Sequence, residues 1–126
     1  MKIDKISYQV TNKFSKLALD YLNEDVKLKP FINHFPTLEN FEKQIAEKQN
    51  YPINRKILVE VLKQQNSNVL LSILSQKNIE SLLNDNTFTV TTGHQLCLFT
   101  GPLYFIYKII STINLAEQLQ KKYPKH

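Results

Sequence analysis

Among its 126 residues the chain has no tryptophan, one methionine, one cysteine and two glycines. The single cysteine, Cys97, excludes an internal disulfide and is typical of a reducing compartment, so we expect a cytoplasmic protein. Because glycine is so rare, Gly93 and Gly101 mark the places where the backbone most needs unusual freedom.

Arginine is also nearly absent, which bears on the partners of this basic chain. The formal net charge is +5 and the isoelectric point is near 9.3, yet Arg55 is the one arginine among 16 basic residues. Phosphate and base recognition favour the planar guanidinium group, and the lysines here are scattered rather than gathered in a patch. We therefore predict no nucleic-acid partner.

Long apolar runs are missing as well. No stretch of about 18 apolar residues occurs, and residues 1–25 contain no apolar core of the kind that a secretory signal needs. The composition, 42% hydrophobic and 21% charged, is that of a chain that folds. These patterns predict a soluble protein without a membrane span.

Charge is absent from one window, and both glycines lie inside it. Residues 86–107 contain no Asp, Glu, Lys or Arg. Within them, Phe88-Thr-Val-Thr-Thr92 is rich in β-branched residues, which predicts a strand buried on both faces of a parallel sheet. Gly93 follows where such a strand must turn, and we expect it to need a positive φ. In open α/β folds, ligands bind at junctions of this kind.

The pair Gly101-Pro102 opens the longest predicted helix, which extends to about Gln120 with Pro102 at its first helical position. One face of this helix is apolar and is predicted to pack against a sheet. The opposite face carries side chains with polar ends and is predicted to meet a ligand or a second domain. The apolar face comprises Leu103, Phe105, Ile106, Ile109, Ile110, Ile113 and Ala116. The opposite face comprises Tyr104, Tyr107, Lys108 and Ser111.

Before residue 87 the pattern is mainly helical. The expected elements are a short strand over 6–10, helices that begin at Asn12, at Thr37 and after Asn54, a helix in the second half of 69–83, and a turn at 84–86. We therefore divide the chain into a helical N-terminal section (1–86) and a β-α unit (87–126). One strand and one helix cannot complete a parallel sheet, so we expect an α/β fold of which this chain is an incomplete part.

The stretch from Val90 to Lys108 reads VTTGHQLCLFTGPLYFIYK, and IISTINLAE follows it. With both glycines, the proline, the tyrosine and the lysine in register, it closely resembles the pattern T-G-[QH]-Q-x-x-L-F-x-G-P-L-Y-x-x-x-K of the BshC family, the cysteine ligases of bacillithiol biosynthesis. Residues 19–22, 31–41 and 54–58 also resemble the helical beginning of that family. The resemblance covers essentially the whole chain and implies a Rossmann-like core.

The resemblance implies a ligase that adds cysteine to the amine of glucosaminyl-malate, which forms an amide and completes bacillithiol. A carboxylate must be activated before it forms an amide, so ATP or another phosphoryl donor is implied. No cofactor is visible in the sequence itself, because the glycine spacing is neither Walker-type nor G-x-G-x-x-G. Family members are several times longer and continue with an acidic-histidine segment and a coiled-coil arm. We therefore expect this portion alone to be inactive, and a homodimer to form through the remaining part.

Seven residues are candidates for binding substrate or cofactor, and no catalytic residue is identified. They are Gly93, His94, Gln95, Gly101, Pro102, Tyr104 and Lys108. Lys108 is the best candidate to meet a phosphate or carboxylate, although a surface lysine with a packed stem would look the same. Relatives commonly carry Gln in place of His94, which favours a hydrogen-bonding role over proton transfer. The glycines, Gln95 and Pro102 have equally simple explanations in turn and helix-start geometry.

Cysteine and the other histidines suggest no further chemistry. Cys97 stands between two leucines and is predicted to be a small core residue rather than a nucleophile. His34 and His126 lack partners at metal-ligand spacing, so we predict no metal.

A second interpretation of the whole chain stays open. In it, the chain is a non-catalytic helical interaction module whose apolar strand and helix dock on a partner chain.

Overall fold

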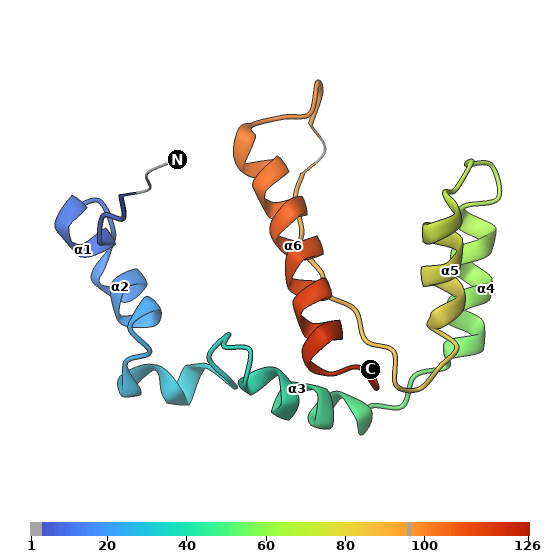
Figure 1. The fold of residues 1–126 in the computed structure, drawn as a ribbon, viewed down its shortest axis with the longest axis horizontal. Coiled ribbons are helices and arrows are strands. Elements are labelled where there is room, and N and C mark those ends of the chain that lie inside the picture. The colour runs from blue at the N-terminus through green and yellow to red at the C-terminus, as the bar shows by residue number, and fades with distance from the viewer. Residues whose placement is uncertain (1–3, 96) are drawn as a thin grey trace. The chain divides into compact units, whose positions relative to one another are not determined.

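The computed structural model describes residues 4–95 and 97–126 and divides into two compact units, Met1–Asn40 and Phe41–His126. Its regular elements are helices, shown in Figure 1. The first unit is built from short helices, and the second from longer ones.

The first unit contains α1 (Tyr8–Thr11), α2 (Lys16–Leu22) and the 3-10 helix η1 (Val26–Phe31). The strand predicted over 6–10 is wrong, because α1 occupies most of that range. The prediction that Asn12 begins the next helix is also wrong. Asn12 ends α1 with φ 53°, a left-handed conformation that asparagine tolerates well. Ser15 caps α2 in its place, its hydroxyl accepting from Ala18 N at 3.2 Å.

The second unit carries the longer helices: α3 (Asn40–Gln49), α4 (Arg55–Gln65), α5 (Ile73–Ser81) and α6 (Leu103–Lys122). The predicted cap of α4 is confirmed, since Asn54 Oδ1 accepts from Ile57 N at 3.2 Å. The helix expected in the second half of 69–83 is present as α5, but it begins earlier than predicted, at Ile73, and ends at Ser81. The helix predicted from Thr37 begins at Asn40 instead, with the Thr37 hydroxyl accepting from Asn40 N at 3.3 Å.

The α/β prediction is wrong for the part of the chain that the structure describes, because no strand occurs in it. Residues 88–95, which include the expected strand, have no regular secondary structure and pass back along α6 (Figure 1). A strand exists only through hydrogen bonds to a neighbouring strand, and β-branched composition alone supplies no such neighbour. The proposed division at residue 87 stays a prediction.

Little of the described chain is buried. Phe35 and Val59 are the buried apolar residues there, with 9% and 3% exposure. Apart from Phe105, the apolar face predicted for α6 is exposed, with Leu103 at 63% and Ile113 at 52%. The half-buried face of α6 shares only Phe105 with the predicted one, because α6 packs against residues 88–95 and not against a sheet. It comprises Phe105, Lys108, Thr112, Leu115 and Leu119.

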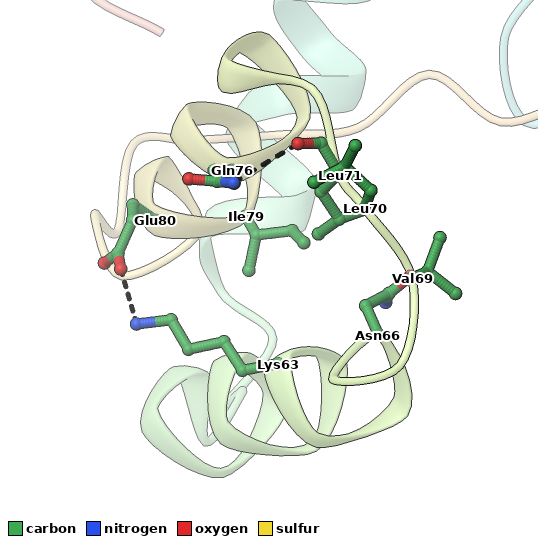
Figure 2. Close-up of a pocket in the computed structure, with 8 residues that line it drawn as sticks. All are labelled: Lys63, Asn66, Val69, Leu70, Leu71, Gln76, Ile79 and Glu80. Atoms are coloured by element: carbon green, nitrogen blue, oxygen red, sulfur yellow. Dashed lines mark hydrogen bonds and ion pairs between the residues drawn. The ribbon is translucent and has the colours of Figure 1, made fainter.

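Each unit contains a hollow between its helices. In the first unit, side chains of α1, α2 and η1 surround an apolar hollow of about 910 Å³. In the second, α4, α5 and the loop between them line a smaller hollow of about 310 Å³, shown in Figure 2. There the Lys63–Glu80 ion pair joins the two helices, and the Gln76 amide donates to Leu71 O at 3.3 Å. None of the residues that line either hollow is among the predicted site residues.

Within the described residues, we find no helix with both the length and the apolar character that a membrane crossing requires.

Candidate functional site

The predicted site residues gather where residues 88–95 and the following loop meet the first turns of α6. Two contacts fix the direction of this segment along the helix. The Phe88 ring lies against the His126 ring with centroids 5.6 Å apart, and the Lys108 ammonium donates to the Gly93 carbonyl. The segment is therefore antiparallel to α6, and its Gly93 end lies near the beginning of that helix.

His94 is half-buried between two aromatic rings. Its ring stacks on Phe105, with centroids 4.7 Å apart and planes at 28°, and meets Tyr104 edge-on at 5.0 Å and 77°. Both aromatic residues belong to the first turn of α6. An imidazole held between two rings has a fixed orientation, so its nitrogens point in defined directions. The hydrogen-bonding role of His94 stays a prediction.

Cys97 contacts His94 at this site, a contact that sequence reasoning missed. Its Sγ lies 3.3 Å from His94 Nε2 and 3.4 Å from the Gln95 carbonyl oxygen. The prediction of a small core residue is wrong, because Cys97 is exposed. Leucine neighbours suggested burial, but the described one, Leu98, is itself 84% exposed. The sequence offered one usable signal, the three-residue spacing from His94, which allows a contact within a tight turn.

Three consecutive residues of the loop adopt the left-handed conformation: Phe99 (φ 50°), Thr100 (φ 67°) and Gly101 (φ 64°). A Cβ at Gly101 would lie 2.6 Å from Cys97 Cβ and 2.9 Å from its Sγ, closer than side chains approach one another. Gly101 is therefore required here both for its φ and for the space beside Cys97. Gly93 is different. The prediction that Gly93 has a positive φ is wrong, and a Cβ at this position would meet no atom within 4 Å.

The remaining predicted residues occupy the start of α6. Pro102 is the N-cap residue, with φ −70° and ψ 153°, rather than the first helical residue. Its fixed φ suits either position, which is why the sequence placed it one residue too far into the helix. Tyr104 is 54% exposed beyond its contact with His94. The Gln95 side chain is exposed, and its backbone carbonyl faces Cys97.

The structure thus brings together Gly93, His94, Tyr104 and Lys108, with Gly101 on the other side of Cys97. The only fixed positive charge among these residues belongs to Lys108. No group of three or more metal-ligating side chains occurs in the part of the chain that is described, and the absence of a metal stays a prediction.

The site is thus a loop that turns at Gly101 and is seated on the start of the long helix α6. The family described as "Bacillithiol biosynthesis BshC, N-terminal Rossmann-like domain" matches residues 1–126. The chain belongs to the BshC family, as the sequence pattern predicted.

Individual relatives agree with this assignment. A protein of Flavobacterium johnsoniae is 58% identical over 128 residues, and one of Flavobacterium psychrophilum is 56% identical over 129 residues. Each match covers 100% of this chain and 24% of the relative. A Bacillus cytotoxicus protein is 33% identical over 99 residues, which are 79% of this chain and 18% of the relative. All three carry the name "Putative cysteine ligase BshC". No solved structure matches the chain.

The chain therefore spans about a quarter of the length of the two Flavobacterium relatives. Its helical structure also differs from the Rossmann-like description of the family over the residues described.

Proposed function

We propose that this chain is the N-terminal part of a ligase that joins cysteine to the amine of glucosaminyl-malate, with bacillithiol as the product. Membership of the BshC family and the cysteine-ligase name of its relatives support the proposal. The structural observation that carries it is the junction of Gly93, His94, Tyr104 and Lys108, which places a cation and a fixed imidazole beside an exposed loop.

In this proposal the junction binds substrate and the bond-making groups belong to the rest of the ligase. The ammonium of Lys108 reaches the loop at Gly93, so a carboxylate or phosphate seated on the loop meets a positive charge. His94, held by Phe105 and Tyr104, presents a polar ring edge for hydrogen bonding to the same ligand. ATP, when bound as a co-substrate, supplies the activation that a carboxylate needs before an amine can displace one of its oxygens.

Assembly and location follow the same proposal. The working enzyme is a cytoplasmic protein, and a homodimer forms through the part of the ligase that lies beyond this chain. The coiled-coil arm that the family resemblance implies belongs to that part as well.

A chimera tests the proposed reaction. This chain replaces the matching 128 residues of the Flavobacterium johnsoniae relative, and the chimera is expressed in a bacterium that lacks its own BshC. We expect bacillithiol to reappear in the low-molecular-weight thiols, measured by mass spectrometry. The purified chimera should form the same product from cysteine, glucosaminyl-malate and ATP.

Two controls make the result decisive. The unmodified Flavobacterium johnsoniae protein shows whether the family reaction is the one proposed, and its failure would contradict the proposal. A chimera with the corresponding segment of the Flavobacterium psychrophilum relative shows whether exchange is tolerated. If both controls restore bacillithiol and the test chimera folds without doing so, this chain does not belong to such an enzyme.

The alternative, a non-catalytic module that docks on a partner, has one observation in its favour. Large apolar residues of α6 are exposed, among them Leu103 and Ile113. Exposure of this kind also fits a segment that packs against the rest of its own ligase. A chimera that is active in the assay above excludes the module interpretation.

A further inference from the structure

The single arginine of the chain, Arg55, makes three hydrogen bonds and one ion pair. Arg55 is the first residue of α4, and its side chain is only 13% exposed. Its guanidinium donates to Leu82 O at 2.9 Å, to Asp85 O at 3.1 Å and to Thr87 O at 3.2 Å. Its Nε also lies 3.3 Å from the Asp85 carboxylate. Arg55 thus joins the start of α4 to the turn that follows α5.

Only arginine can make this set of contacts. Three backbone carbonyls and one carboxylate surround the guanidinium, and its five N–H donors in a rigid fork can reach all of them together. A lysine ammonium in the same place is a compact group on a flexible stem and would serve one or two of the acceptors. The chain uses lysine at its other basic positions, which sets Arg55 apart.

The turn that Arg55 holds leads directly into the candidate site. Thr87 precedes the segment 88–95, which carries Gly93 and His94. The other end of that segment is held by Lys108, whose ammonium donates to Gly93 O. Two cations from two helices therefore hold the two ends of a segment that has no strand partner among the described residues. Arg55 determines where the segment begins, and Lys108 determines where it meets α6.

We propose that Arg55 is a positioning residue for the ligase reaction, which places the loop of Gly93 and His94 by holding the turn before it. The inference rests on the proposed function, because it takes the junction on α6 as part of the substrate site. Arg55 does not itself touch the substrate. Displacement of a substrate-binding loop by about 1 Å is enough to cost on the order of 100-fold in rate.

The test uses the chimera with Arg55→Gln and Arg55→Lys, and with Lys56→Gln as the matched control. Lys56 is the exposed neighbour of Arg55 on α4. We expect Arg55→Gln to lower kcat/KM by about 10- to 100-fold, mainly through KM, and Arg55→Lys to give an intermediate loss. Lys56→Gln should keep the parent value. Hydrogen exchange of peptides that cover residues 82–95 should be faster in both Arg55 variants, while α6 keeps its protection.

Other outcomes overturn the inference. If Arg55→Gln lowers the melting temperature but keeps kcat/KM, the cluster is merely structural. If Arg55→Gln does not fold, Arg55→Lys decides, and a parent-like kcat/KM in that variant contradicts the need for the guanidinium fork. Failure of the proposed function gives a different result from failure of the Arg55 inference. In that case the chimera without further substitutions is inactive, or His94→Ala leaves its kcat/KM unchanged.

Discussion

At the scale of single residues, the two glycines show how differently one residue type can be used. Gly101 has φ +64° and leaves no room for a side chain, whereas Gly93 has neither a positive φ nor a neighbour within 4 Å of a Cβ. We expect Gly101→Ala to destabilise the chimera by more than about 1 kcal/mol, because alanine at a positive φ is strained and its methyl group meets Cys97. Thermal and urea unfolding of the chimera measure the loss.

Gly93→Ala is the matched control. An alanine there meets no obstacle and reduces the freedom of the unfolded chain, so its effect should be near zero or stabilising by about 0.4–1 kcal/mol. Equal losses for the two substitutions would contradict the left-handed conformation of the loop at Gly101.

The exposed thiol of Cys97 gives a second test at this scale. Because Cys97 is exposed, the native chain should react with a thiol reagent such as DTNB at a rate within about tenfold of the urea-unfolded chain. The measurement needs only the 126-residue chain, in which Cys97 is the single cysteine. If Cys97 reacted with DTNB only after the chain unfolds, the sequence-based prediction that it is a core residue would be correct.

At the scale of elements, the helix caps depend on contacts a few residues apart. Asn54→Ala removes the acceptor for Ile57 N at the start of α4 and should cost about 1 kcal/mol of unfolding free energy. Gln64→Ala, on the exposed surface near the other end of α4, should change it by less than about 0.5 kcal/mol. Urea unfolding of the chimera compares the two variants. A loss at Gln64 as large as that at Asn54 would mean that the cap does not stabilise the helix.

The caps also show what the sequence could predict. The cap at Asn54 was predicted correctly because the capping residue, the first helical turn and the apolar stripe of α4 all lie within a few residues of one another. Asn12 was misplaced because asparagine suits both a helix start and a left-handed helix end, and Ser15 competed for the same role. The strand at Phe88–Thr92 failed for another reason: its pairing partner is a non-local requirement that local β-branched composition cannot supply.

The sequence likewise predicted some residues of the site and missed others. The motif placed Gly93, His94, Tyr104 and Lys108 close together, and the structure brings them together because the extended segment and the helix are joined by a short loop. Arg55 stands out in the sequence only for its rarity. Its role depends on carbonyls 27 to 32 residues away, which no local pattern connects to it.

At the scale of the whole molecule, the accessible surface is large for the mass. The chain exposes 11145 Å². A compact monomer of 14.7 kDa would expose about 7,000 Å², and even two separate compact units of these sizes would expose about 8,000 Å². The excess includes many large apolar side chains, such as Leu70 at 99% and Phe99 at 96%. The relatives are about four times as long as this chain, since the matches cover 24% of them, and we expect their additional residues to cover that surface.

This excess of apolar surface predicts how the isolated chain behaves. We expect light scattering to show concentration-dependent association and the dye ANS to fluoresce strongly on the chain, because exposed apolar patches bind one another and bind the dye. In the chimera the same residues are covered, so ANS fluorescence per molecule should fall several-fold and the scattering should give one species. A monodisperse monomer of the 126-residue chain that unfolds cooperatively would contradict this expectation. It would show that the chain buries its own apolar surface, and it would favour the independent interaction module over a segment that depends on the rest of a ligase.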